Sequence, residues 1–331
     1  MDSRRRVVRF TRFGLSLACM ALLGGSPSVS SAQRYPLRPV KIIVPYAPAG
    51  SVDLIARLLA QGLQTPLGQS VVVENRAGAG GAIGTDLVVR ATPDGYTLLV
   101  VATGALTINV HLQRLAYDAQ KDLAPVSMLA ASPLILAVKT DLPVRSVDAL
   151  IAWGRSHPEG LSFSTNGPGS LSYLSVELLK RMARIPITVL AYKGGGPAAT
   201  AIASGEVDAG ITDSQAVLPL MRAGRVRALA ISDPMRALVL PDLPTIAEAG
   251  VPGYAAYSWV GLFAPAGTAP EIVARLVEAT RVAFSQPTIV EQLRNAALDA
   301  RPGTPAELAS VLRSESDKWR GLIAEAAIRA D

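Results

Sequence analysis

Four loops rich in Gly, Pro and Ala each follow an apolar, β-branched run and precede a stretch with helical periodicity. They span residues 45–51, 75–81, 164–170 and 192–197. A turn without bulky side chains leaves backbone N–H groups uncovered at the N-terminus of the next helix. The helix dipole adds partial positive charge there, so such a turn attracts anionic oxygens. A single loop of this kind can equally be a simple strand-to-helix turn, but several on one face predict an anion-binding cleft.

Polar residues near these loops complete the predicted site. Neutral donors such as Asn166 and Ser170 can hold a carboxylate without burying a fixed charge. Asp213 follows a predicted strand, where it either orients a donor, accepts an ammonium or hydroxyl group, or caps the next helix. Tyr46 is expected as a cleft wall or as a core residue. The predicted ligand-binding residues are Tyr46, Ala49, Gly50, Ser51, Asp53, Thr103, Ser164, Asn166, Gly167, Ser170 and Asp213.

Residues suited to covalent, metal or nucleotide chemistry are scarce. The chain has two histidines, His111 and His157, and no Gly-x-Ser-x-Gly motif, which argues against a hydrolase triad. There is no His pair at ligand spacing and no dense acidic loop, so no metal site is expected. Ile83 stands where the dinucleotide fingerprint needs its third glycine. The sequence therefore predicts a binding protein without catalytic residues, metal ion or cofactor.

The elements that must position the loops alternate between strand and helix along the chain. This pattern is typical of an α/β protein with mainly parallel sheets. A strand at Val40–Val44 and a helix at Asp53–Thr65 flank the first loop. Interruptions at 131–133 and 250–257 predict two lobes, one of residues 33–131 plus 257–331 and the other of residues 132–256. A ligand cleft is expected between them.

Residues 1–32 have the pattern of an export signal. Five arginines precede an apolar run at Phe13–Leu23, and Ser30, Ser31 and Ala32 are small residues suited to cleavage near Ala32. The run is too short to span a bilayer. This segment holds the chain's single cysteine. It also contains five arginines and one aspartate, so residues 33–331 carry only +2 of the chain's net charge of +6. We therefore expect a periplasmic protein without disulfides and without a nucleic-acid partner.

Several motifs outside the loops carry a family resemblance. They include Val73-Glu74-Asn75-Arg76, Pro93-Asp94-Gly95-Tyr96, residues 243–250 and residues 258–268. With the loops, they resemble the solute receptors of the tripartite tricarboxylate transporters, the Bug family of extracytoplasmic binding proteins. The resemblance runs from Tyr35 to Asp331. It implies a two-lobed periplasmic binding protein of type II-like fold, with each lobe a mainly parallel sheet flanked by helices.

The resemblance also implies how the protein works. The first loop, residues 46–53, is expected to hold a ligand carboxylate through backbone groups and ordered waters. Residues 164–170 and Asp213 would face it from the other lobe, and the closed receptor would deliver the ligand to membrane permease subunits. Ala49 stands where the family usually has glycine, which predicts a slightly re-aimed first loop. Residues 170–174 replace a stretch that often contains small residues and histidine.

The ligand class stays open at this point. A di- or tricarboxylate, an acidic amino acid or an aromatic acid would each fit backbone donors. The loops at 45–51, 164–170 and 192–197 contain no arginine, which favours one firmly held carboxylate with a variable tail. Two other functions remain as alternatives. One is a sensor component that presents a ligand to a signalling partner. The other is an exported enzyme acting on a carboxylate, which would depend on a shifted pKa at Asp53 or Asp213. A monomer is expected.

Overall fold

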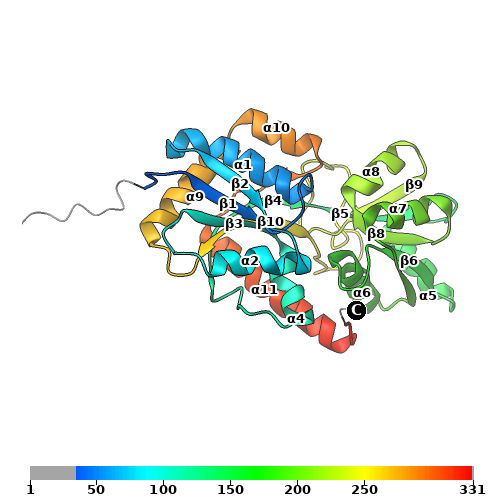
Figure 1. The fold of residues 1–331 in the computed structure, drawn as a ribbon. Helices are drawn as coiled ribbons and strands as arrows, with labels where there is room; N and C mark the ends of the chain where they lie inside the picture. The colour runs from blue at the N-terminus through cyan, green and yellow to red at the C-terminus, as the bar shows by residue number, and fades with distance from the viewer. Residues whose placement is uncertain (1–34, 330–331) are drawn as a thin grey trace, which may run out of the picture. The chain divides into compact units, whose positions relative to one another are not determined.

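The computed structural model describes residues 35–329, which contain two mixed β-sheets flanked by helices (Figure 1). The first sheet has the order β11-β4-β10-β3-β1-β2 and the second β7-β6-β8-β5-β9. The first sheet consists of β1 (Val40–Val44), β2 (Val71–Asn75), β3 (Thr97–Ala102), β4 (Leu123–Ser132), β10 (Ser258–Pro265) and β11 (Asp299–Ala300). The second consists of β5 (Leu134–Lys139), β6 (Leu161–Thr165), β7 (Ile187–Ala191), β8 (Ala209–Asp213) and β9 (Val226–Ile231). The expected export signal, residues 1–32, lies outside the described residues.

The helices connect these strands or follow them. They are α1 (Ser51–Leu67), α2 (Ala82–Val89), α3 (Thr103–Thr107), α4 (Asn109–Leu112), α5 (Val147–Ser156), α6 (Leu171–Ala183), α7 (Gly195–Ser204), α8 (Ser214–Arg222), α9 (Pro270–Phe284), α10 (Pro287–Asn295) and α11 (Pro305–Glu325), with a short 3₁₀ turn, η2, at Ala79–Gly81. Across residues 35–329, none of the helices combines the length and the apolar character needed to cross a bilayer.

Helices cover both faces of the first sheet. Figure 1 shows α1 and α10 on one side of it and α2 and α11 on the other. Ile43 of β1 and Leu99 of β3 are fully buried in one apolar cluster with residues of α2 and α11. Gly84 allows α2 to approach closely, because a Cβ at this position would lie 2.7 Å from the Arg76 carbonyl oxygen and 2.8 Å from Pro45 Cα. The loop after β1 is thereby fixed against α2.

The second sheet is buried on both faces as well. In β5, Leu134 and Leu136 pack in a core with α5 and α6, whereas Ile135 and Ala137 pack in another with α7 and α8. This alternation follows from the two-residue period of a strand, and it explains why β5 is apolar from Leu134 to Val138.

The α/β prediction is confirmed, but the sheets are mixed where the sequence predicted mainly parallel ones. β1 pairs in parallel with β2 and β3, and β6 with β7 and β8, as expected of strands joined by helices. Two strands are antiparallel to both of their neighbours. Strand β10 is antiparallel to β3 and β4, and strand β5 is antiparallel to β8 and β9. The difference has a topological cause. Strand β4 passes into β5 through Pro133 without the crossover helix that makes successive strands parallel. The exact lobe boundaries stay a prediction.

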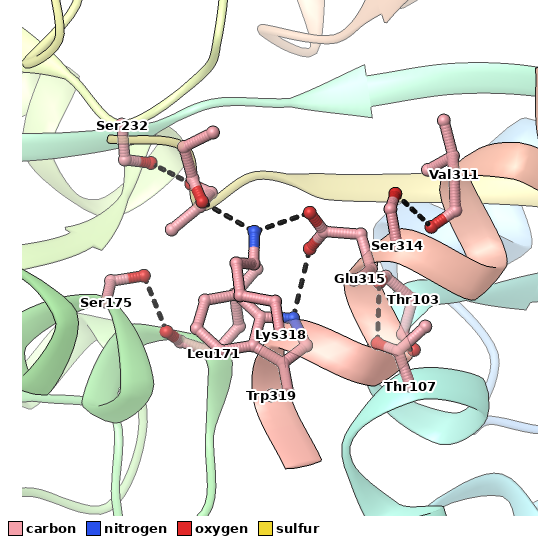
Figure 2. Close-up of polar contacts among 12 residues, drawn as sticks. Thr103, Thr107, Leu171, Ser175, Ser232, Val311, Ser314, Glu315, Lys318 and Trp319 are labelled. Carbon is pink, nitrogen blue, oxygen red and sulfur yellow. Dashed lines mark hydrogen bonds and ion pairs between the residues drawn. The ribbon is translucent and has the colours of Figure 1, made fainter. Parts of the chain in front are cut away.

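Helix α11 packs against both sheets. Leu308 and Leu312 belong to the core of the first sheet, whereas Trp319 and Ile323 belong to a core of the second. Between these two pairs lies a polar cluster, in which Figure 2 shows Glu315, Lys318 and Trp319 turned toward one another. The helix therefore ties the two halves of the fold together.

The polar cluster on α11 contains an ion pair between the buried Glu315 and the partly buried Lys318. Lys318 Nζ lies 2.5 Å from Glu315 Oε1 and donates at 2.6 Å to the Ala255 carbonyl, in the segment that leads into β10. Trp319 Nε1 donates to Glu315 Oε2 at 3.0 Å. Burial raises the pKa of Glu315 and lowers that of Lys318, and the mutual attraction of the two charges opposes both shifts. Each charge thus offsets part of the cost of burying the other.

A second buried charge lies just after β9. Asp233 is fully buried, and burial raises its pKa to about 7. The attraction of Arg301 opposes this shift, and repulsion from Asp299 adds to it. Arg301 Nη2 lies 3.2 Å from both carboxylates, and Tyr257 also interacts electrostatically with Asp233. Asp299 accepts hydrogen bonds from the Leu238 and Val239 N–H groups, so its carboxylate has partners besides Arg301.

This pKa predicts a pH-dependent stability. A carboxyl group whose pKa is higher in the folded state binds its proton more tightly there, so the folded state loses stability as pH rises from about 4 to 7. Asp233→Asn removes this cost. We expect the variant to melt a few degrees above the wild type at pH 8, with the difference shrinking as pH falls to 4. Equal differences at every pH would contradict the assignment.

Candidate functional site

A cavity of about 360 Å³ lies at the first turns of α1 and α6, which flank the two sheets. It is lined by Tyr46, Gly50, Ser51, Val52, Asp53, Gly80, Ala102, Gly104, Ala105, Ile108, Asn109, Gly169, Ser170 and Leu171. Two of the four predicted loops, those after β1 and β6, thus contribute to one cavity. A third loop, the one after β2, contributes Gly80.

The loop after β1 delivers the start of α1 to the cavity. Gly50 is the N-cap, with extended backbone (φ −83°, ψ 171°) and without a side chain to cap the helix. The first helical hydrogen bond is from Leu54 N–H to the Gly50 carbonyl, at 3.0 Å. The N–H groups of Ser51, Val52 and Asp53 precede it and have no intrahelical acceptor. Since these three residues line the cavity, an anion placed there meets several donors and the positive end of α1.

Asp53 holds this loop in shape. Its Oδ2 accepts hydrogen bonds from Ala49 N–H at 3.0 Å and from Arg57 Nε at 2.9 Å, and its Oδ1 accepts from Asn75 Nδ2 at 2.9 Å. Burial tends to raise its pKa, but these bonds, led by that from Arg57, outweigh burial and lower it. Ala49 adopts φ +70°, a left-handed conformation that is unfavourable for alanine and is stabilised by this bond. Asp53 therefore acts as a positioning residue of the first loop.

Removing the Asp53 carboxylate should disturb both the loop and binding. We expect Asp53→Ala to lower the free energy of unfolding by about 2 kcal/mol, because three donors lose their acceptor. Ligand affinity should fall as well, since the α1 N-terminus is no longer held. Urea unfolding and calorimetric titration measure the two effects. The control is Asp317→Ala, which removes an exposed carboxylate from α11; an equal loss in both variants would contradict the positioning role.

Tyr46 forms part of the cavity wall. Burial raises the pKa of its hydroxyl, and a hydrogen bond with the backbone of Ala102 partly opposes the shift. Ala102 and Gly81 lie close to the ring: a Cβ at Gly81 would stand 3.4 Å from the Tyr46 oxygen. The hydroxyl is therefore neutral at physiological pH and remains a hydrogen-bonding group rather than an acid.

The start of α6 forms the opposite wall. Ser170 is its N-cap and accepts a hydrogen bond from Tyr173 N–H at 3.1 Å, while its hydroxyl donates to the Gly167 carbonyl at 2.7 Å. Leu171 and Gly169 line the cavity beside it. This wall thus combines a capped helix N-terminus with one large apolar side chain.

Asn166 and Asp213 bind one another, and neither is among the cavity-lining residues. Asn166 Nδ2 donates to Asp213 Oδ2 at 2.9 Å, and Thr212 donates to Asn166 Oδ1 at 2.5 Å. Burial raises the pKa of Asp213, with the Asn166 bond opposing the shift. A Cβ at Gly195 would lie 2.5 Å from Asp213 Oδ2, so this carboxylate lies at the start of α7.

The predicted residues divide into two groups. Tyr46, Gly50, Ser51, Asp53 and Ser170 line the cavity. The other six do not: the buried Ser164 donates to the Ala198 carbonyl, Thr103 bonds with Thr107, and Ala49, Gly167, Asn166 and Asp213 make the contacts given above. Their role in ligand binding stays a prediction.

The sequence predicted a ligand contact at Thr103, the first residue of α3, but not the wall that α3 and α4 form. Ala105, Ile108 and Asn109 line the cavity, and Asn109 Nδ2 donates to the Gly80 carbonyl at 3.0 Å. These two helices have five and four residues, too few to produce a helical period in the sequence. The available signal was the position of the segment directly after the buried strand β3.

The cavity carries little chemistry beyond hydrogen bonding. Among its described lining residues, Asp53 is the one charged side chain, and Lys, Arg and His are absent. His111 bonds with Ser316 Oγ at 2.9 Å, and His157 stacks on Trp153 with ring centroids 4.0 Å apart, so neither histidine reaches the cavity. No group of three or more His, Cys, Asp or Glu side chains suited to a metal ion occurs in residues 35–329.

The chain is similar to known receptors along most of its length. The family model for the tripartite tricarboxylate transporter family receptor, TctC, matches residues 55–328. Protein BugT of Bordetella pertussis is 38% identical over 322 residues, covering 96% of this chain and 98% of that protein.

Two solved structures of the same kind contain carboxylates. Rpa4515 of R. palustris, solved with adipate, is 36% identical with a TM-score of 0.71, and the match covers 89% of this chain and 99% of that one. MatC of Rhodopseudomonas palustris, solved with bound malate, is 35% identical with a TM-score of 0.67, covering 87% and 100%. These matches confirm the two-lobed binding-protein fold and the resemblance noted in the sequence. The chain therefore belongs to the TctC family, the receptors of the tripartite tricarboxylate transporters.

Proposed function

We propose that this protein is a periplasmic receptor that captures a small carboxylate and delivers it to the permease subunits of a tripartite tricarboxylate-type transporter. The observation that carries the proposal is the cavity at the N-termini of α1 and α6. Each end supplies backbone donors and a positive dipole end without a cationic side chain. The adipate and malate held by Rpa4515 and MatC support a carboxylate ligand.

Closure follows from the placement of the two helices beside different sheets. A ligand that bonds to both N-termini stabilises the state in which they are close, by its difference in affinity between the two states. The closed state then differs in shape from the open one, which is the signal that a membrane partner needs. Neither helix has to change conformation for this to occur.

The ligand can be found by a stability screen. The protein is unfolded, refolded to remove any co-purified ligand, and heated with a panel of carboxylates, amino acids and sugars. A ligand at 100 times its Kd adds about 2.7 kcal/mol of stability, which shifts the melting temperature measurably. A stabilising carboxylate recovered unchanged supports the receptor. A carboxylate that is consumed would favour an enzyme, and stabilisation by sugars alone would contradict the proposal.

The proposed periplasmic location rests on residues 1–32, whose sequence has the pattern expected of an export signal. We expect the protein recovered from the periplasm to have an intact mass that begins near Gln33. A mass that retains residues 1–32 would contradict cleavage near Ala32.

A further inference from the structure

One buried carboxyl group, that of Asp233, has no hydrogen-bond partner among the described residues. The side chain is fully buried, and neither of its oxygens accepts a hydrogen bond. Arg301 Nη2 lies 3.2 Å from Asp233 Oδ2, but it donates its hydrogen bond to Asp299 Oδ2. A buried carboxylate without hydrogen bonds is costly, whereas the neutral carboxyl group avoids most of that cost. The surroundings of Asp233 therefore suit its protonated form.

Asp233 lies where the two connections between the sheets meet. The first connection runs from β4 through Pro133 into β5, and the second runs from the end of β9 to β10. They are joined at Ser232, whose N–H donates to the Leu134 carbonyl and whose carbonyl accepts from Ala256 N–H, both at 2.9 Å. Asp233 is the next residue along the chain. A change at this side chain therefore acts on the segments about which two lobes would move.

The charged neighbours of Asp233 belong to the other sheet. Asp299 is in β11, which pairs with β4 in the first sheet, and Arg301 N–H donates to the Leu129 carbonyl of β4 at 2.9 Å. Asp233 itself follows β9 of the second sheet. The interaction between these groups thus crosses from one sheet to the other, and its strength depends on how the two sheets are placed.

The charges around this carboxyl group balance only while it is protonated. Arg301 is the one cation among the described groups that interact with Asp233, and Asp299 already offsets its charge. Tyr257 interacts electrostatically with both Asp233 and Glu315 of α11, and burial raises the pKa of its hydroxyl to about 12, so it supplies no charge. Burial likewise raises the pKa of Asp233 to about 7. The group therefore exchanges its proton near neutral pH.

We propose that Asp233 is a proton-operated switch that sets the arrangement of the two lobes. The neutral carboxyl group stabilises the arrangement seen in this structure. When its proton passes to solvent water, the carboxylate favours an arrangement in which the crossing admits water or brings Arg301 closer. Ligand capture then depends on the pH of the surrounding medium. The proposal goes beyond carboxylate binding and does not depend on which ligand the receptor takes.

Energy transfer between dyes on the two lobes tests the switch without a ligand. Residues 33–331 contain no cysteine, so Gln64→Cys in α1 and Ala223→Cys just after α8 give two exposed labelling sites, one beside each sheet. With dyes that are insensitive to pH, we expect the transfer efficiency to change between about pH 5 and pH 8.5, with a midpoint near 7. A transfer efficiency that is constant over this range would overturn the proposal and leave the carboxylate receptor standing.

Variants at position 233 identify the group that titrates. Asp233→Asn and Asp233→Leu keep a side chain of similar size that cannot ionise, so both should hold the low-pH transfer efficiency over the whole range. The matched control is His111→Gln, because His111 is a titratable partner of Ser316 on α11, the helix that packs against both sheets. This variant should retain the wild-type change. A pH response that survives in both Asp233 variants, or that disappears in His111→Gln, would overturn the assignment to Asp233.

Discussion

Replacing Gly50 by tryptophan should lower carboxylate affinity roughly 100-fold or more while leaving the fold intact. Gly50 lines the cavity, and its φ of −83° is one that any residue adopts. The nearest atom to a Cβ added there is the Ala47 carbonyl oxygen at 4.0 Å, so the backbone accepts a side chain without strain. An indole at this position would fill space that the ligand needs, and overfilling a packed site costs about 1–3 kcal/mol or more. Calorimetric titration with the ligand found in the screen measures the loss.

Two control variants separate this effect from damage to the fold. Gly50→Ala adds one methyl group where there is room, and it should retain affinity within a few-fold. Gly321→Trp places an indole on the exposed face of α11, where a Cβ meets no atom within 4 Å, and it should bind like the wild type. Unchanged affinity in Gly50→Trp would refute the assignment of the ligand to this cavity.

Replacing Lys318 by methionine should destabilise the protein by about 3 kcal/mol. The substitution keeps most of the side-chain volume but leaves the Glu315 carboxylate buried without its counter-charge, and removal of one partner from a buried ion pair has a cost of this size. The Ala255 carbonyl loses its donor at the same time. Unfolding in guanidinium chloride, followed by circular dichroism, gives the change in free energy.

The double variant Glu315→Gln with Lys318→Met distinguishes an unpaired charge from lost packing. Glutamine can still accept from Trp319 Nε1, which bonds to Glu315 Oε2 at 3.0 Å in the native protein, and it leaves no charge behind. We expect the double variant to be clearly more stable than Lys318→Met alone. If both are equally unstable, packing of the Lys318 stem rather than its charge is the main contribution.

The parts of the site that were predictable from sequence are those with a local cause. Val40–Val44 is an apolar, β-branched run, and the structure has β1 with the same bounds. The following Pro- and Gly-rich stretch was correctly expected to be a turn that leads into a helix, but α1 begins at Ser51, two residues before the predicted start at Asp53. The cap at Ser170 has an equally local signal, since serine precedes an apolar helix there.

The parts that were not predictable depend on contacts between distant segments. Asp53 was expected among the ligand contacts, but its bond to Asn75 joins residues 22 positions apart and commits the carboxylate to the loop. Asn109 reaches the cavity through helices too short to leave a periodic pattern. The two-residue strand β11 exists only because it pairs with β4. Such features follow from the tertiary fold and leave no signal in the adjacent sequence.

The position of α11 has a consequence for how the protein unfolds. Because Leu308 and Leu312 are anchored in one core and Trp319 and Ile323 in another, neither core can come apart without exposing part of a helix that the other core needs. The two sheets therefore share one cooperative unit, and amide hydrogens in β1 and β5 should exchange with similar free energies of opening. A ligand that binds between them protects both equally, so native-state hydrogen exchange in either sheet reports occupancy of the cavity.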